Sequence, residues 1–255
     1  MQYLRGLLQY CGTNYKGWQV QPNCLTIQKV LQDVISRITN ETIKVKAAGR
    51  TDAGAHALGQ VISFHTTTGL DPSRLKKAIN ALLPPDIRLI DLTATYEGFH
   101  PRYDAKMKSY LYLIHLGQET SPFIAPFVWD VRCNLNLDKL KEASRHLIGS
   151  HDFSGFMASG SEVSNTVRTV YCIDIAVINE IPFLGQTLQN DLLAIEVTAN
   201  GFLKQMVRNI VGTLIDIGRG HLCVGAIGSI LNSKDRKRAG ITAPARGLYL
   251  KAVYY

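Results

Sequence analysis

The chain has 255 residues, of which 46% are hydrophobic and 19% charged, a composition typical of a folded globular protein and not of a disordered chain. Its formal net charge of +8 favours a polyanionic partner. No apolar run approaches the roughly 20 residues that span a bilayer, and the first residues lack the pattern of a signal peptide. We therefore expect a cytoplasmic protein that does not bind membranes.

The first part of the chain alternates between strand and helix patterns. Hydrophobic spacing and cap residues predict strand Tyr3–Tyr10, a helix after Thr26, strands Ile43–Ala48 and Gln60–His65, a helix opened by Asp71 and Pro72, and strand Ile87–Tyr96. This order indicates an α+β half with helices over one side of a sheet.

A similar order of elements follows in the second part. The patterns predict strand Ser109–Ile114, helix Leu137–Ile148, strands Val167–Val177 and Leu192–Ala199 around a turn-rich stretch Asn179–Asn190, helix Phe202–Ile215, helix Val224–Leu231 and strand Gly247–Tyr254. We predict two similar α+β halves, residues 1–104 and residues 105–255.

Cysteine and charge patterns bear on cofactors and partners. The cysteines are scattered singly without metal-site spacing, so we expect reduced thiols, no metal and no cofactor; they are Cys11, Cys24, Cys133, Cys172 and Cys223. Basic residues form short clusters, which suit a broad phosphate-contacting surface; these are Lys76–Lys77, Arg102 with Lys106 and Lys108, and Lys234–Arg238. RNA is the favoured partner.

One predicted loop, Ala47–Ala57, places Arg50, Asp52 and His56 among small residues. It is not a phosphate-binding loop, because no lysine follows Gly54. It is not an aspartic-protease loop either, because that chemistry needs two carboxylates in a recurring context. On this pattern alone, a solvated surface turn and a functional site both remain open.

The nine residues Gly49–Ala57 resemble the catalytic signature G-R-T-D-A-G-V-H-A of the tRNA pseudouridine synthase A family, with Ala55 in place of valine. Further blocks resemble the same family along almost the whole chain, in order: Gly12–Trp18, Lys108–Tyr112, Phe202–Asn209 and Ala243–Leu248. Cys11 departs from the aspartate that the family commonly has before Gly12.

The resemblance implies roles for individual residues. Asp52 would be the catalytic carboxylate, and whether it attacks ribose C1′, adds to the ring or removes a ribose proton stays open. Tyr110 would stack on the target base and take the C5 proton, and Leu248 would form an apolar wall of the pocket. Arg208 would pair with Asp52. Arg50 would fill the space left by the flipped base or contact phosphate. We expect His56 to support the loop.

The resemblance also implies a fold and a substrate. The fold would be two ferredoxin-like (RRM-like) halves in one continuous, mostly antiparallel sheet with flanking helices and a central catalytic cleft. The protein would be a homodimeric isomerase that converts uridine to pseudouridine at positions 38, 39 and 40 of the tRNA anticodon stem-loop, without a cofactor.

Two other classes remain as alternatives. A non-catalytic RNA-binding module would also combine ferredoxin-like halves with a basic surface, although a recognisable aromatic RNA-binding block is missing from the sequence. A glycosidase that cleaves the same bond would need a second carboxylate near Asp52, and the loop offers none.

Overall fold

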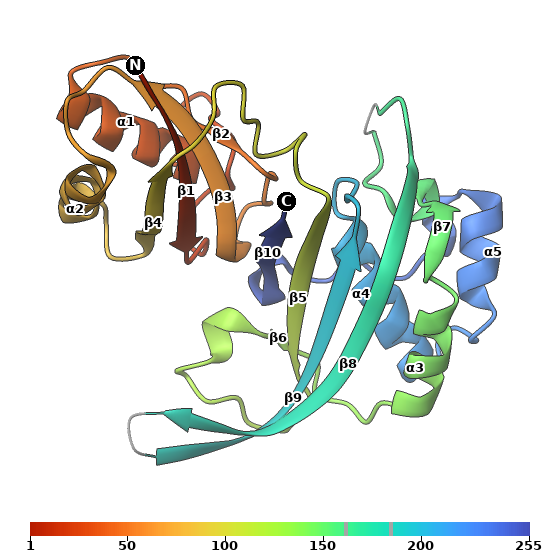
Figure 1. The fold of residues 1–255 in the computed structure, drawn as a ribbon. Coiled ribbons are helices and arrows are strands. Elements are labelled where there is room, and N and C mark those ends of the chain that lie inside the picture. The colour runs from red at the N-terminus through yellow and green to blue at the C-terminus, as the bar shows by residue number, and fades with distance from the viewer. Residues whose placement is uncertain (161–162, 184–185) are drawn as a thin grey trace. The chain divides into compact units, whose positions relative to one another are not determined.

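Strands and helices alternate in a mixed α+β arrangement, seen in a computed structural model that describes residues 1–160, 163–183 and 186–255 (Figure 1). The chain divides into two compact units, unit 1 with Met1–Lys106 and Tyr249–Tyr255, and unit 2 with Met107–Leu248. The predicted halves, 1–104 and 105–255, differ from these units mainly in the C-terminal segment, which groups with unit 1 because its strand pairs there. No helix in the described ranges is long and apolar enough to cross a membrane.

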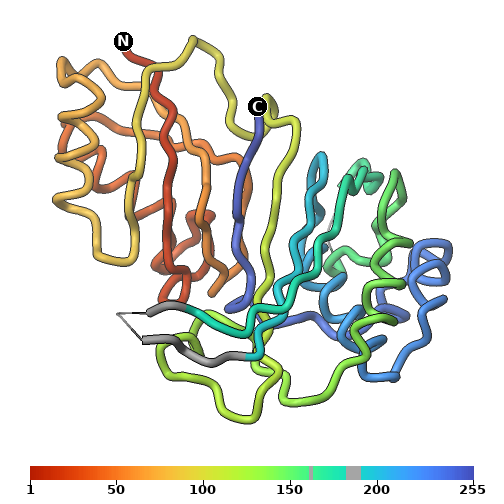
Figure 2. Tube along the Cα trace, turned by 60° about the horizontal axis from the view of Figure 1, so that its bottom comes forward, coloured from red at the N-terminus to blue at the C-terminus, as the bar shows by residue number. Residues whose placement is uncertain are grey.

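Unit 1 is a sheet with two helices. Its elements are β1 (Gln2–Tyr10), α1 (Ile27–Thr39), β2 (Lys46–Ala47), β3 (His56–Thr66), α2 (Pro72–Leu82), β4 (Ile87–Ala94) and most of β10 (Leu248–Tyr254). The strands lie in the order β4-β1-β3-β10, and β2 pairs with β3. Strand β1 is antiparallel to β3 and β4, whereas β10 is parallel to the start of β3. Helices α1 and α2 lie on one face of this sheet (Figures 1 and 2).

Side-chain caps begin both helices of unit 1 where the sequence predicts. The Thr26 hydroxyl accepts from the Lys29 backbone N–H at 3.4 Å, and Asp71 accepts from two N–H groups of the first turn of α2. The predicted strand Ile43–Ala48 is wrong in length, because only Lys46–Ala47 pairs as β2. The backbone before it bonds to α1 side chains instead: Val45 N–H donates to Gln32 at 3.1 Å.

Alternation along β1 and β3 gives the sheet of unit 1 two chemically different faces. Leu4 pairs with Phe64 in the register, and both side chains are buried. Tyr3 pairs with His65 one residue away, so these two side chains point to the opposite face. The first face is apolar and carries the core, and the second carries polar and aromatic groups.

Unit 2 is an antiparallel sheet with three helices in its described residues. Its elements are β5 (Met107–His115), β6 (Trp129–Asp130), α3 (Leu137–Arg145), β7 (Gly149–Asp152), β8 (Val167–Phe183), β9 (Gln186–Ala199), α4 (Met206–Gly218) and α5 (Ala226–Ser233). The strand order is β5-β9-β8-β7, each neighbouring pair being antiparallel, and β6 pairs in parallel with β5.

The prediction that Asn179–Asn190 is a turn-rich stretch is wrong. This stretch is the end of the β8–β9 hairpin, with Glu180 opposite Gln189 and Phe183 opposite Gln186; residues 184 and 185 lie outside the described residues. The hairpin runs beyond the helices of unit 2 (Figure 1). Because no helix covers this end, its sequence does not need the apolar alternation that marks a strand.

Helix α4 begins at Met206, four residues after the predicted start at Phe202. Gln205 adopts a left-handed conformation with φ of 60°, which ends the preceding loop and prevents an earlier start. The Ala158 N–H donates to the Lys204 carbonyl at 2.9 Å and holds this loop. From Met206 onward almost every residue of α4 is buried.

A segment after α5 crosses α4 at very short range. A Cβ added at Gly212 in the middle of α4 would lie 1.7 Å from the Ile241 carbonyl oxygen, so only glycine allows this approach. The Gly240 N–H donates to the Thr213 hydroxyl at 2.9 Å, and the Ile241 N–H donates to Asp216 at 3.2 Å. We call residues 239–244 the strap.

We expect Gly212→Ala to lower the free energy of unfolding by about 3 kcal/mol, because the new methyl group displaces the strap backbone. The matched control is Gly228→Ala in α5, where an added Cβ meets nothing within 4 Å. There alanine gains helix propensity, and we expect a stabilisation of about 0.5 kcal/mol. Urea denaturation of the two variants measures both changes in the free energy of unfolding. Equal stability of the two variants would contradict the close approach of the strap to Gly212.

Candidate active site

The loop that carries Asp52 connects β2 to β3 in unit 1 and is held by the loop after β1. Trp18 N–H donates to the Thr51 carbonyl at 3.1 Å, and Gly54 N–H donates to the Tyr15 carbonyl at 3.3 Å. The aromatic rings of Tyr15 and Trp18 are buried. Trp18 therefore anchors this loop against the one that carries Asp52.

Two glycines bring these loops into backbone contact. A Cβ at Gly12 would lie 1.8 Å from the Ala55 carbonyl oxygen. Gly17 has φ of +88°, and a Cβ there would lie 2.7 Å from the Thr51 carbonyl oxygen. Side chains at either position would push the Asp52 loop away, so the Gly12–Trp18 block supports that loop.

Buried polar side chains hold the other end of the loop. The Gln60 amide, fully buried in β3, accepts from Gly49 N–H at 3.3 Å and donates to the Gly49 carbonyl at 2.8 Å. The hydroxyls of Tyr10 and Thr51 are hydrogen-bonded at 2.8 Å. Burial raises the pKa of Tyr10 to about 12, so this phenol stays neutral.

Sequence reasoning did not identify Gln60 or Tyr10 as supports. The available signal was a glutamine next to the apolar residues Val61 and Ile62 of a strand, since a buried amide needs hydrogen-bond partners.

His56 supports the loop, as its position suggested. The Gly12 N–H donates to Nδ1 of His56 at 3.1 Å, so this nitrogen acts as an acceptor and carries no proton. The ring is 2% exposed and stacks on Tyr249 with centroids 4.8 Å apart. A buried imidazole engaged in this way is a structural group.

The carboxylate-bearing residue lies in a tight turn. Ala55 N–H donates to the Asp52 carbonyl at 3.1 Å, and Gly54 provides the positive φ, 80°, that the turn needs. Asp52 is half-buried, whereas Arg50 is exposed. The loop therefore presents a carboxylate and, two residues before it, a guanidinium from a fixed backbone.

Tyr110 lies in β5 of unit 2, with its ring almost completely buried. It meets the edge of Phe202 with centroids 4.9 Å apart and planes at 78°. The hydroxyl of Tyr112, two residues along the same strand, donates to the Pro244 carbonyl at 2.6 Å. Tyr110 is therefore positioned by the loop before α4, and Tyr112 by the last residue of the strap.

Arg208 lies in the first turn of α4. It donates one hydrogen bond to the strap and accepts another from it. Its Nε donates to the Ala243 carbonyl at 2.7 Å, and its own carbonyl accepts from Ala243 N–H at 3.1 Å. These bonds restrict the plane of the guanidinium. Leu248 follows at the start of β10 and is buried; the preceding Gly247 packs on the Tyr112 ring, where an added Cβ would lie 2.8 Å away.

Asn209 and Arg236 are a second support that sequence reasoning missed. Asn209 is fully buried; its amide donates to the Phe156 carbonyl at 2.7 Å and accepts from Arg236 at 3.0 Å and from Thr242 at 2.7 Å. Arg236 also donates to the Gly240 carbonyl. Burial lowers the pKa of Arg236, and its guanidinium group forms hydrogen bonds within the protein.

Some residues of the predicted basic cluster Lys234–Arg238 therefore bind other groups of the protein. Lys234 pairs with Asp152 at 2.8 Å, and the hydrogen bonds of Asp152 to Lys234, Thr166 and Ser154 hold its pKa well below the usual range despite partial burial. Lys237 and Arg238 of the same cluster are exposed.

The predicted site residues fall into two groups. Arg50 and Asp52 share one loop of unit 1. Tyr110, Arg208 and Leu248 belong to unit 2, where the segment from Ala243 to Leu248 bonds to Arg208 and to Tyr112, the neighbour of Tyr110 two residues along β5. Among the residues that the structure describes, no group of His, Cys, Asp and Glu side chains is arranged to hold a metal ion.

Comparison with known proteins identifies the family. A family model described as tRNA pseudouridine synthase matches residues 7–104 and 143–255. The chain is 44% identical over 249 residues to tRNA pseudouridine synthase A of Thermoanaerobacter sp. (strain X514), covering 98% of each chain. It is 39% identical over 255 residues to the Geobacter sulfurreducens protein of that name, covering 100% of each, and 42% identical to the Chlamydia muridarum protein, covering 97% of this chain and 90% of the relative.

Solved structures add only a distant likeness. An archaeal box H/ACA sRNP Nop10–Cbf5 complex matches with a TM-score of 0.34 and 16% identity, covering 84% of this chain and 43% of that one. The match to the family model and the full-length relatives instead decide the assignment: this chain belongs to the tRNA pseudouridine synthase A family, isomerases that convert uridine to pseudouridine in tRNA.

Proposed function

We propose that this protein isomerises uridines 38, 39 and 40 of the tRNA anticodon stem-loop, with Asp52 as the catalytic carboxylate. The observation that carries the proposal is the match of Gly49–Ala57 to the family signature, on a loop whose backbone is held from two sides. A fixed loop keeps a half-buried carboxylate in one place before RNA binds, which lowers the cost of reaching the reactive geometry.

The reaction moves one bond and adds or removes no group overall. The bond between ribose C1′ and uracil N1 breaks, the detached base turns, and a bond forms between C1′ and C5. The proton on C5 leaves and N1 gains one, so atoms and charge balance. Asp52 supplies the carboxylate that acts on the sugar or the ring, and no redox or group-transfer cofactor is required.

Other residues have supporting roles in the proposal. Tyr110 stacks on the target base and takes the C5 proton, and Leu248 provides an apolar wall that holds the detached base. Arg208 pairs with Asp52; its bonds to Ala243 support this role, because they orient the guanidinium from one side. Arg50, exposed beside Asp52, fills the space left by the flipped base or contacts phosphate.

The proposal requires residues of both units at one uridine. Family resemblance supports this, together with two ferredoxin-like halves joined in one continuous sheet around a catalytic cleft and a homodimer that binds tRNA across both subunits. A tRNA substrate also supports the expected cytoplasmic location.

We expect Asp52→Asn to lower the isomerisation rate by at least about a thousandfold while tRNA binding is kept, because asparagine keeps the shape but cannot act as a carboxylate. The measurement is tritium release from C5-tritiated uridine in unmodified tRNA transcripts, followed by mapping of modified positions. The control is Asp33→Asn, which removes an exposed carboxylate on α1. An active Asp52→Asn protein would refute the catalytic assignment.

The same assay distinguishes an isomerase from a protein that only binds RNA. Tight tRNA binding by the wild-type chain with no tritium release from any tRNA would identify a non-catalytic RNA-binding module.

Tyr110 allows a second test, because its ring and hydroxyl have separate tasks in the proposal. We expect Tyr110→Phe to keep tRNA affinity but slow C5 tritium release by about a hundredfold, the usual range for losing a proton-transfer group. Tyr110→Leu should lower the rate further, since stacking is also lost. Single-turnover rates at saturating tRNA separate the two effects, and a full wild-type rate for Tyr110→Phe would remove the hydroxyl from the mechanism.

A further inference from the structure

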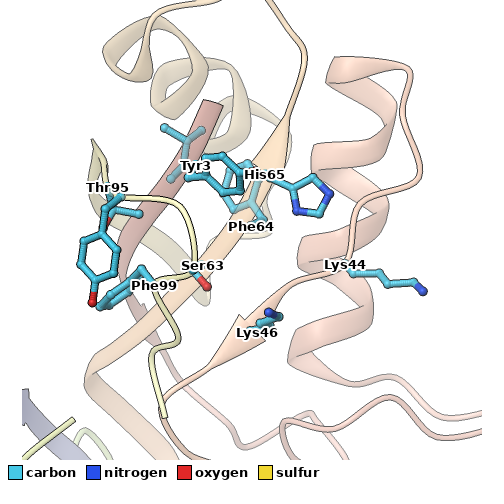
Figure 3. A pocket seen from close by; sticks show the side chains of 11 residues that line it. Tyr3, Lys44, Lys46, Ser63, Phe64, His65, Thr95 and Phe99 are labelled. Atoms are coloured by element: carbon cyan, nitrogen blue, oxygen red, sulfur yellow. The ribbon is translucent and has the colours of Figure 1, made fainter. Parts of the chain in front are cut away.

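Unit 1 carries a pocket on the sheet face opposite α1 and α2, separate from the Asp52 loop. It has a volume of about 160 Å³, and its lining includes Tyr3, Lys44, Lys46, His65, Tyr96 and Phe99. Figure 3 shows Thr95 and Phe99 on one side of it, Lys44 and Lys46 on the other, and Tyr3, Ser63 and His65 between them. The family signature and the residues discussed above leave this pocket without a role.

Strand register explains why these side chains converge. Tyr3 lies opposite His65 in the β1–β3 pair, and Lys46 of β2 lies opposite Ser63. Residues two apart on a strand share a face, so Ser63 and His65 point the same way. Lys44, two residues before Lys46, adds a second cation on the same side.

The two lysines of the pocket carry positive charges that are not paired directly with a carboxylate. Lys44 and Lys46 are exposed, and neither ammonium group forms a hydrogen bond or ion pair with a residue that the structure describes. The nearby carboxylates keep their negative charge but bind phenols: Glu97 accepts from the Tyr3 hydroxyl at 2.6 Å, and Asp104 accepts from the Tyr96 hydroxyl at 2.7 Å. Both lysine ammonium groups can therefore contact an anion.

An exposed aromatic ring completes the recognition chemistry. Tyr96 is 63% exposed, and its ring is held in place by an edge contact with Phe99, with centroids 5.7 Å apart, and by its bond to Asp104. A fixed, solvent-facing ring across a pocket from two cations matches RNA, whose bases stack and whose phosphates are negative.

The pocket and the Asp52 loop lie toward different ends of β3 within unit 1. His56, at the start of β3, adjoins the Asp52 loop, and the pocket residues Ser63 and His65 lie seven and nine positions further along the same strand. At the usual rise per residue these separations are roughly 23 and 30 Å. A nucleotide bound there is not the target uridine itself.

We infer that this pocket is a second tRNA subsite, in which Lys44 and Lys46 each bind a backbone phosphate and Tyr96 stacks on an adjacent unpaired base. The inference rests on the proposed function for the identity of the RNA. It adds a remote anchor that raises affinity for whole tRNA without taking part in bond breaking.

Binding of an unmodified tRNA transcript by the full-length protein tests the lysines. Lys44→Gln/Lys46→Gln should raise Kd about tenfold and make the dependence of log Kd on log salt shallower by about 1.5, because two phosphate contacts are lost. The rate at saturating tRNA should not change. Lys44→Arg/Lys46→Arg, which keeps both charges, should bind like wild type.

The matched control removes the same charge from the other face of unit 1. Arg37 in α1 and Arg74 in α2 are exposed and lie outside the predicted basic clusters, and Arg37→Gln/Arg74→Gln should leave Kd and its salt dependence almost unchanged. Tyr96→Ala should weaken binding at least about fivefold, while Tyr96→Phe keeps the ring and the affinity.

Three results would overturn the subsite: normal Kd and salt dependence in Lys44→Gln/Lys46→Gln, an equal loss in the Arg37→Gln/Arg74→Gln control, or a change of oligomeric mass in the lysine variant, which would make this face a contact between copies. Failure of the subsite is distinguishable from failure of the proposed function. In the first case the wild type still releases tritium from tRNA, and in the second it releases none.

Discussion

The contact between the backbone of Gly12 and the carbonyl of Ala55 is the constraint on which the Asp52 loop depends. It is possible only without a side chain at residue 12. The same glycine donates its N–H to His56, so one residue fixes both the turn after Asp52 and the first residue of β3. Catalytic groups that are held by backbone contacts need little rearrangement when substrate arrives, which is where electrostatic catalysis gains most.

Unit 2 uses the same principle with different residues. Gly212 lets the strap lie against α4, and the strap then bonds to Arg208 at Ala243. The buried Asn209–Arg236 pair closes this arrangement from the other side. A charged side chain at the start of a helix is therefore oriented by a distant segment, which explains why the motif blocks Phe202–Asn209 and Ala243–Leu248 occur together in one chain.

The fold could be predicted where local chemistry decides it. Thr26 and Asp71 cap their helices as expected, and the Asp52 loop lies between strands. The β8–β9 hairpin end could not be predicted, because strands without a covering helix lose the alternating pattern. The supports of the site, Gln60 above all, were equally hidden, since a buried amide shows its partners only when the strand and the loop are in place.

The return of β10 to unit 1 has a consequence for synthesis of the chain. Tyr249 stacks on His56 and pairs with it in the sheet, although all of unit 2 separates them in sequence. A growing chain on the ribosome therefore completes unit 2 before it can add the last strand to unit 1. The order of translation keeps the surroundings of His56, and with them the loop beside it, unfinished until the final residues emerge.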